Sequence, residues 1–531
     1  MKKPPFCEIS DIKDIYLDVQ HCNFLFTGII EIKNDMFLLV LLKFLYNIIL
    51  EVKFMQNRIV NRSFAVLMAV VFTFASVFAA GTLNVSAATK LSVSPSSSTV
   101  SVGGSATIKS NKAVKWSVSK GSSVVKLVKK SSKSVVVKGL KEGTGYIKAK
   151  AGSSSKTVKV VVKAAKGEVT KGEAKKGRMV ININLSKSGT AYAQEGKVAK
   201  VWVPIPESDK FQTISNFKYD ADFTTVNKIT RDSAGNKVLY LEWGANVAPE
   251  DRTARVEYSI TRYAIKSTKM VEKGSIPQSI KDEYLGEFET SGSLTSGIVK
   301  QTSDKIVADA NAKTTLEKAK AIFDWTVQNL YRRETAVDDL KFSGCGRGQV
   351  EIVLETTKGG KCTDINSTFV ALCRSQGVPA REKFGIRLNN GASGNANGNE
   401  HCRCEFYLPG TGWVEADPAD TLKVLLKEDG ISYESGKIGA DRVSADRWAV
   451  LYGKYWGAND NNWVKLAEGR DITLEPAQTA TGPSNDIWYR SILNESGKLN
   501  NMGYVYGETD GEYMDTYSPA KFGYMYKFYA E

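Results

Sequence analysis

The stretch Gly-Gly-Lys-Cys-Thr-Asp-Ile-Asn-Ser-Thr-Phe-Val-Ala-Leu-Cys-Arg, residues 359–374, decides how the second half of this chain is interpreted. Its apolar side chains Ile365, Phe369 and Leu372 recur at helical spacing, which predicts a helix with one face packed inward. The Gly-Val-Pro run at 377–379 is typical of a helix end. The stretch therefore predicts a short glycine-led approach followed by an amphipathic helix.

Cys362 is the first residue of this predicted helix. The macrodipole and the unpaired N–H groups at a helix N-terminus favour the thiolate form of cysteine. The thiolate is the form that attacks carbonyl carbon. Cys362 is therefore a candidate nucleophile.

A nucleophile of this kind needs a base, and the chain has two histidines, His21 and His401. His21 lies in a segment that we expect to be absent from the mature protein, which leaves His401. The run 401–407 alternates and predicts a strand. Its core-facing residues would be Cys402, Cys404 and Phe406, and its other face would carry His401, Arg403 and Glu405.

A turn and a return strand follow. The segment Leu-Pro-Gly-Thr-Gly at 408–412 matches a cell-wall sorting pattern, but it lies far from the C-terminus, so we interpret it as a turn. The next strand, 413–417, places Trp413, Glu415 and Asp417 on one face. A hairpin of this kind would bring Asp417 beside His401, where a carboxylate orients the imidazole and stabilises its charged form.

These motifs together resemble the transglutaminase-like superfamily over roughly residues 300–425. The resemblance is carried by Cys362 and its helix, by Gly-Val-Pro-Ala-Arg at 377–381, by the His401 strand ending in Tyr-Leu-Pro-Gly at 407–410, and by Gly-Trp-Val at 412–414 leading to Asp417-Pro418. It implies a papain-like α+β core and a catalytic triad of Cys362, His401 and Asp417. The family often has an aromatic two residues after the histidine, where this chain has Arg403.

The resemblance implies acyl transfer through a thioester on protein or peptide amides, with no cofactor and no metal. Water as the acceptor gives a peptidase or deamidase, which we favour slightly, and a lysine gives a cross-link. The alternative is a non-catalytic cell-surface or wall-binding protein that uses the core as a scaffold.

The N-terminal region predicts export. A basic region and the apolar run 64–80, followed by small residues, are typical of a signal peptide at 55–87. Residues 1–54 are then a spurious extension from an over-long start assignment. The rival interpretation is a membrane segment at 36–50, which is short for a span of about 20 residues. Export predicts a secreted or cell-surface protein.

Residues 89–163 predict an all-β sandwich and resemble a bacterial Ig-like domain of group 2. They contain 16 lysines, no arginine and one acid, Glu142, so their net charge of +15 equals that of the whole chain. This asymmetry favours a polyanionic partner, for which we expect anionic wall polymer or a membrane surface. Nucleic acid is not expected for an exported protein. Lysines that only solvate a spacer are the alternative.

The remaining boundaries complete a multidomain interpretation. We expect a linker at 164–176, a second β-rich domain at 177–290, the catalytic core at 291–425 and a Trp/Tyr-rich extension of the core at 426–531. A Gly/Asn/Ser loop at 389–399 predicts a mobile substrate-gating lid.

The cysteines allow more than one interpretation. If the signal peptide is cleaved, Cys345, Cys373, Cys402 and Cys404 remain beside Cys362. We favour buried small residues for these four over a disulfide or redox role. No second cysteine pair has zinc-ribbon spacing, which argues against zinc.

Overall fold

The computed structural model describes residues 89–164, 167–187, 194–333, 344–389, 392–480, 492–510, 512–513 and 523–531. The predicted extension 1–54 and signal peptide 55–87 lie outside these residues. No helix among the described residues is both long enough and apolar enough to cross a bilayer.

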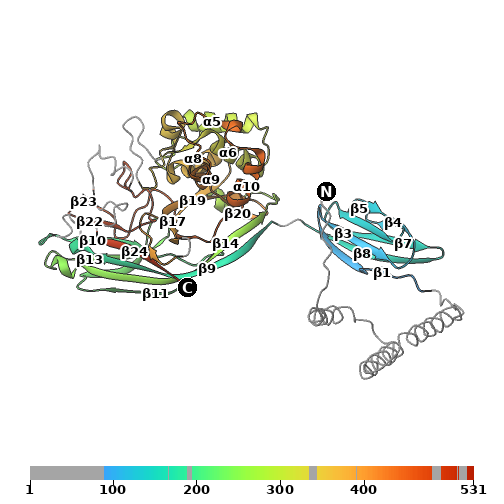
Figure 1. Cartoon of the computed structure of the whole chain (residues 1–531), viewed down its shortest axis with the longest axis horizontal. Helices are drawn as coiled ribbons and strands as arrows, with labels where there is room; N and C mark the ends of the chain where they lie inside the picture. The colour runs from blue at the N-terminus through green and yellow to red at the C-terminus, as the bar shows by residue number, and fades with distance from the viewer. Residues whose placement is uncertain are drawn as a thin grey trace, which may run out of the picture. The chain divides into compact units, whose positions relative to one another are not determined.

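The N-terminal module consists of two four-stranded sheets with one shared core (Figure 1, blue). The first sheet has the order β1-β3-β6-β5 and the second β2-β8-β7-β4. Alternate residues such as Val135, Val137, Val158 and Val160 are buried between the sheets, as the period of a strand requires. The module is all-β as expected, and its Ig-like identity stays a prediction. Its strands are β1 Val93–Ser94, β2 Ser97–Ser101, β3 Ser105–Ser110, β4 Lys115–Lys120, β5 Val125–Lys130, β6 Ser134–Gly139, β7 Gly143–Ala151 and β8 Ser154–Lys163.

Two five-stranded sheets follow and enclose a second core. One has the order β11-β14-β9-β24-β18, and its strands are β9 Glu168–Asn184, β11 Gln212–Ala221, β14 Thr253–Lys269, β18 Gly394–Asn395 and β24 Tyr524–Ala530. The other has the order β12-β13-β10-β22-β23, and its strands are β10 Ala199–Pro204, β12 Val226–Arg231, β13 Lys237–Trp243, β22 Tyr506–Thr509 and β23 Glu512–Tyr513. Short 3-10 turns lie at Leu185–Lys187 and Pro249–Asp251.

The α+β part places its helices against a four-stranded sheet of order β20-β19-β17-β21 (Figure 1). The sheet strands are β17 Ala380–Arg387, β19 Glu400–Leu408, β20 Gly412–Ala416 and β21 Trp463–Glu468. The helices are α4 Gln278–Tyr284, α5 Gly297–Asp309, α6 Thr315–Asn329, α7 Val350–Ile352, α8 Cys362–Ser375, α9 Pro418–Lys427 and α10 Ala445–Tyr455. A π turn at Val353–Thr357, a 3-10 turn at Gly439–Asp441 and the parallel pair β15 Tyr331–Arg332 and β16 Gly359–Gly360 complete it.

Helix α8 is the centre of this part. Ile365, Phe369 and Leu372 are fully buried in the core that α8 shares with α5, α6 and α9, as the helical spacing predicts. Strand β19 contributes Cys402, Cys404 and Phe406 to the same core. The helix therefore has neighbours on every side, and its first residue is held where the sheet and helices meet.

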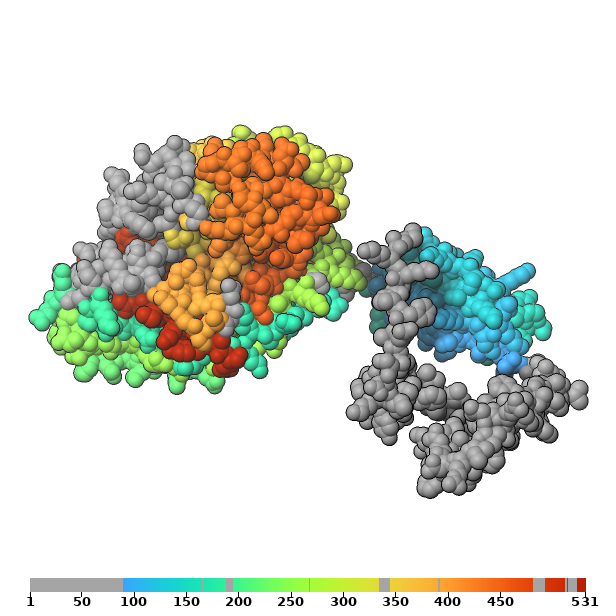
Figure 2. Space-filling view, in the orientation of Figure 1, coloured from blue at the N-terminus to red at the C-terminus, as the bar shows by residue number. Residues whose placement is uncertain are grey.

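The predicted domain boundaries do not follow the observed elements. Strand β9 begins at Glu168 and pairs with β14 along its length, so most of the expected linker 164–176 is strand. The expected core extension 426–531 supplies strands to three sheets, because β21 pairs with β17, β22 with β10 and β24 with β9. Figure 2 shows red C-terminal residues between the green strands and the orange residues of the α+β part. The β-rich and α+β parts are therefore interleaved in sequence.

Strand β24 should matter for stability in proportion to what it buries. Phe528 is fully buried in the second core, whereas Met525 on the same strand is 44% exposed. Phe528→Ala should cost about 3–5 kcal/mol because a large cavity remains. Met525→Ala should change stability by less than about 0.5 kcal/mol. Thermal unfolding followed by near-UV circular dichroism measures both, and equal shifts for the two variants would contradict the assigned register.

Candidate active site

Cys362 begins α8, separated from β16 by Lys361 alone, and only 2% of its surface is exposed. The carboxylate of Asp364, two residues further, accepts hydrogen bonds from the backbone N–H groups of Lys361, Arg347 and Gly348 at 2.8–2.9 Å. A carboxylate in the first turn satisfies N–H donors that a helix start leaves without a partner. Asp364 therefore holds the approach loop against the helix and fixes the position of the thiol.

His401 and Asp417 come together through the β19–β20 hairpin. His401 Nε2 lies 2.8 Å from Asp417 Oδ2, and both side chains are buried. Asp417 ends the return strand and caps α9, because its Oδ1 accepts from the backbone N–H of Asp420 at 3.0 Å. Both oxygens of the Asp417 carboxylate are therefore engaged, Oδ1 by the first turn of α9 and Oδ2 by His401.

The interaction with His401 is one of the causes that lower the pKa of the Cys362 thiol. Hydrogen bonds from Cys345, Cys402 and His401 lower the pKa of Cys362 well below its usual value, against the effect of burial. Burial lowers the pKa of His401. The negative charges of Asp420 and Asp417 raise it, and their effect is larger, so the pKa is above its ordinary value. Opposite shifts in neighbouring groups favour a thiolate beside an imidazolium.

Comparisons with known proteins agree with this geometry. Residues 300–418 match the family model of the transglutaminase-like superfamily. A Haemophilus influenzae protein of uncharacterized function is 32% identical over 349 residues, which cover 61% of this chain and 85% of the relative. The chain belongs to the transglutaminase-like superfamily. The family model ends one residue after Asp417, so it spans the cysteine, histidine and aspartate sites.

Two further similarities of this transglutaminase-like chain are more limited. The Bacillus subtilis protein YebA, also uncharacterized, is 32% identical over 111 residues, which cover 19% of this chain and 15% of that protein. A cysteine protease-like structure from Cytophaga hutchinsonii is 13% identical, with a TM-score of 0.35, and the match covers 68% of this chain and 100% of that one.

A second carboxylate near His401 was missed by the sequence analysis. Asp420 Oδ2 lies 3.3 Å from His401 Nε2, and Asp420 Oδ1 lies 2.5 Å from the guanidinium of Arg387. Burial raises the pKa of Asp420, but His401 and Arg387 lower it more strongly, so this carboxylate is ionised. The spacing Asp417-Pro-Ala-Asp420 was the available signal, because the third residue of a helix turns its side chain back toward the cap.

Asn366 is another residue that sequence reasoning missed. It lies one turn after Cys362 on α8, and its Nδ2 donates to the carbonyl of Cys402 at 2.9 Å and reaches Asp417 Oδ1 at 3.5 Å. Its Oδ1 accepts from the backbone N–H of Ala419 at 3.2 Å. One amide thus links the nucleophile's helix, the histidine's strand and the aspartate's cap.

Glu400 immediately precedes His401 on β19. Burial, with a smaller contribution from the negative charge of Cys362, raises the pKa of Glu400 to about 7. A carboxyl group that is partly protonated at neutral pH is able to donate a hydrogen bond or a proton. Glu400 is therefore an additional titrating group near the thiol.

Arg403 takes a structural position in this family member. Its side chain is fully buried, with Nε 3.7 Å from Asp417 Oδ2 and an NH2 group 2.7 Å from Asp460 Oδ1. The guanidinium also stacks over Trp463 at 4.8 Å. Arg403 therefore supplies a counter-charge behind Asp417, and the aromatic beside it comes from β21.

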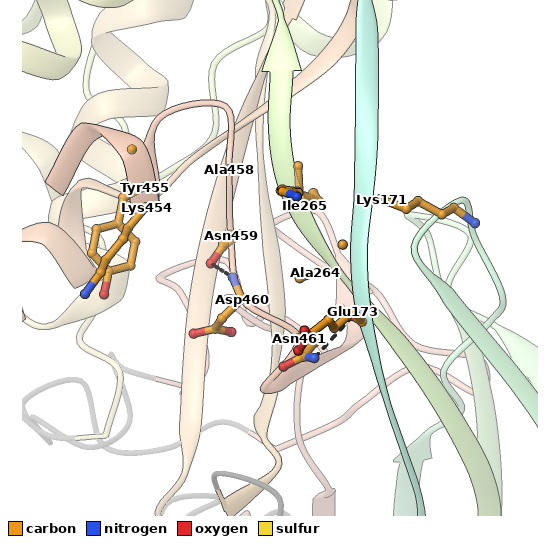
Figure 3. Close-up of a pocket in the computed structure, with 13 residues that line it drawn as sticks. Lys171, Glu173, Ala264, Ile265, Lys454, Tyr455, Ala458, Asn459, Asp460 and Asn461 are labelled. Carbon is orange, nitrogen blue, oxygen red and sulfur yellow. Dashed lines mark hydrogen bonds between the residues drawn. The ribbon is translucent and has the colours of Figure 1, made fainter. Parts of the chain in front are cut away.

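One hollow of the described residues lies beside Asp460. It has a volume of about 780 Å³ and is lined by residues that include Tyr455, Asn459, Asp460 and Ile265. Figure 3 shows Asn459, Asp460 and Asn461 on one loop, facing the strand that carries Ala264 and Ile265. None of Cys362, His401 and Asp417 lines it, so this hollow is not the place where chemistry at the thiol would occur.

The segment 389–399, predicted to be a loop that acts as a mobile lid, contains a short strand among its described residues, and its role as a lid stays a prediction. Gly394–Asn395 forms strand β18, which pairs with Phe528 and Lys527 of β24. Ala396 is fully buried, and its N–H donates to the carbonyl of Tyr526 at 2.8 Å. The Gly/Asn composition suggested mobility, but pairing with the C-terminal strand satisfies this backbone.

Two ligand-type clusters occur among the described residues: His401, Asp417 and Asp420 form one, and Cys345, Cys362 and Cys402 form the other. The carboxylates of the first cluster are already engaged by Arg387, Arg403 and the cap of α9. We therefore interpret the first cluster as a histidine with two carboxyl groups whose charges are balanced by the neighbouring arginines.

Removing Arg403 should destabilise the protein more than removing its exposed partner. Arg403→Met would remove the buried guanidinium that lies behind Asp417, at a cost of about 3–5 kcal/mol. Asp460 is 46% exposed, so Asp460→Asn should cost about 0–1 kcal/mol. The two melting temperatures test this, and an equal or smaller loss for Arg403→Met would refute the counter-charge role.

Proposed function

We propose that this protein is an exported cysteine enzyme that acts on amide bonds of protein or peptide substrates, with hydrolysis favoured over cross-linking. The observation that carries the proposal is the buried contact of His401 Nε2 with Asp417 Oδ2 at 2.8 Å, together with a Cys362 thiol whose pKa is lowered in part by His401. This is the order of nucleophile, base and orienting carboxylate that covalent acyl transfer requires.

The reaction would begin with attack by the Cys362 thiolate on an amide carbonyl carbon. The tetrahedral oxyanion would accept a hydrogen bond from the backbone N–H of Cys362 at the start of α8. His401 would then give its proton to the leaving amine as the C–N bond breaks, which leaves a thioester and a neutral imidazole.

Water completes the cycle in the favoured version. Neutral His401 would take a proton from the water that attacks the thioester, and the C–S bond would break to release the acid and the thiolate. A lysine amine in place of water would give a cross-link by the same steps. Asp417 and Asp420 would stabilise the imidazolium whenever it forms.

The Lys-rich module supports a wall-associated location within this proposal. Most of its lysines, such as Lys126, Lys129 and Lys130, are exposed. Exposed like charges attract a polyanion, and we propose anionic wall polymer as that partner. A non-catalytic wall-binding protein is the second candidate, and the same lysines favour it. Pull-down on purified wall, with and without residues 89–163, tests the partner independently of chemistry.

The first test concerns the nucleophile. Cys362→Ala should abolish labelling by iodoacetamide at neutral pH, because no other described cysteine is held as a thiolate beside a histidine. Cys373→Ser is the matched control, since Cys373 lies buried on the same helix and should not affect labelling. Peptide mass spectrometry locates the adduct. Unchanged labelling of the Cys362→Ala variant would refute the assignment.

The reaction type needs a separate experiment. The full chain is incubated with a peptide library and a labelled primary amine, and the products are identified by mass spectrometry. Cleaved or deamidated peptides support hydrolysis, and amine adducts support cross-linking. Turnover by the Cys362→Ala variant equal to that of the wild type would contradict a cysteine mechanism, and no product from either would favour the wall-binding alternative.

The pH profile of kcat/KM tests Asp417. Activity requires the Cys362 thiolate and the His401 imidazolium, so it should fall at low pH as the thiol protonates and at high pH as the imidazolium is lost. Asp417→Asn removes a negative charge that raises the pKa of His401, so the alkaline limb should move to lower pH. Catalysis should also fall by roughly 10²–10⁴-fold.

Asp429→Asn is the control for the pH profile, because Asp429 pairs with Arg447 beyond the end of α9. Both limbs should stay in place for this variant. An alkaline limb that is unmoved in Asp417→Asn would show that Asp417 does not act on His401.

A further inference from the structure

Two cysteines beside Cys362 form and break no bond in the proposed reaction. The sulfur atoms of Cys345, Cys362 and Cys402 all lie within 4.8 Å of one another, and all three residues are buried free thiols. They come from three different elements: the loop before α7, the start of α8 and strand β19. The fold therefore concentrates three thiols at one point.

Specific contacts hold each of the three sulfurs. Cys345 Sγ is 3.0 Å from the hydroxyl of Tyr504, and its carbonyl accepts from the N–H of Thr363 at 2.7 Å. Cys402 Sγ is 2.9 Å from the hydroxyl of Thr363. The Cys362 thiol lies 3.7 Å from the carbonyl of Cys345. The cluster is thus tied together by Thr363, the residue after the nucleophile.

The spacing suits a thiophilic d¹⁰ cation such as Zn²⁺. Zinc–sulfur bonds of about 2.3 Å in a tetrahedron place two sulfurs about 3.8 Å apart, so the cluster needs to contract by at most about 1 Å. Soft thiolate ligands select such ions over Mg²⁺ or Ca²⁺. Three protein ligands would leave the fourth position to water.

We propose that Cys345, Cys362 and Cys402 form an inhibitory binding site for a thiophilic d¹⁰ cation, with Zn²⁺ as the probe ion. The bound ion holds the Cys362 sulfur as a ligand, withdraws electron density from it and occupies the space beside it, so the sulfur is a weaker and less accessible nucleophile toward a substrate carbonyl. Binding releases thiol protons to solvent, so affinity rises with pH. The inhibitory consequence rests on the proposed function, whereas the binding site does not.

Zinc binding is measured on the full chain, kept reduced with a phosphine, by titration with chelator-buffered Zn²⁺. One equivalent should bind to the wild type. Cys345→Ser and Cys402→Ser should each weaken binding by more than about tenfold, because each loses one of three ligands. Cys404→Ser is the matched control, since Cys404 lies two residues along the same strand and donates to the carbonyl of Ala416 at 3.0 Å instead.

No binding by the wild type, or equal affinity in Cys345→Ser and Cys402→Ser, would overturn the proposal. An equal loss in Cys404→Ser would do the same. If either cluster variant fails to fold by circular dichroism, Co²⁺ is added to the wild type. A thiolate-to-cobalt charge-transfer band that Zn²⁺ displaces supports the site, and its absence refutes it.

Activity then separates the two proposals. If amide turnover exists and Zn²⁺ at saturating occupancy leaves it unchanged, the inhibitory site is wrong and the proposed function stands. If zinc binds through the three cysteines but no turnover is found under zinc-free conditions, the binding site stands and the proposed function fails.

Discussion

The site depends on the buried contact between His401 and Asp417, because both side chains need polar or charged partners in the core. A histidine and two carboxyl groups are costly to bury unless each has partners. Asp417 and Asp420 both lie near His401 Nε2, so two carboxyl groups surround one imidazole. Arg387 and Arg403 approach these carboxylates from β17 and β19 and supply the balancing charge.

This charge balance explains why the C-terminal part of the chain is needed. Arg403 is itself buried and is held by Asp460 and by the ring of Trp463, which both lie beyond residue 455. The indole N–H of Trp463 also donates to the carbonyl of His401 at 2.9 Å. Strand β21 thus completes both the four-stranded sheet and the environment of the histidine. The α+β part therefore depends on sequence outside the segment matched by the family model.

Local patterns were predictable because they depend on neighbours in sequence. The start of α8 at Cys362, the inward face of β19 and the turn at 408–412 all follow from spacing within a few residues. The capping box from Thr314 to Glu317 at the start of α6 depends on a spacing of the same kind, and both of its hydrogen bonds are present. The approach of Asp417 to His401 needed only one hairpin.

The errors concern pairing between distant segments. The charged start of β9 resembled a linker because its side chains are largely exposed, but its backbone pairs with β14 some ninety residues later. The segment 389–399 resembled a loop because its composition is rich in Gly and Asn, but Gly394–Asn395 pairs with β24. The composition of a segment indicates how exposed its side chains are. It does not indicate which other strand pairs with its backbone N–H and C=O groups.

The sequence by itself determined the family and predicted Cys362, His401 and Asp417 as the candidate site, because these depend on residue type and short spacing. Only the tertiary structure decided which other groups share the site: Asp420 and Asn366 beside the carboxylate, Arg403 behind it, and Cys345 and Cys402 beside the thiol. The polar groups among them come from several elements that pack around His401, and they provide the hydrogen bonds and charges that a buried histidine needs. Burial and long-range pairing are properties of the folded chain and leave no fixed spacing in the sequence.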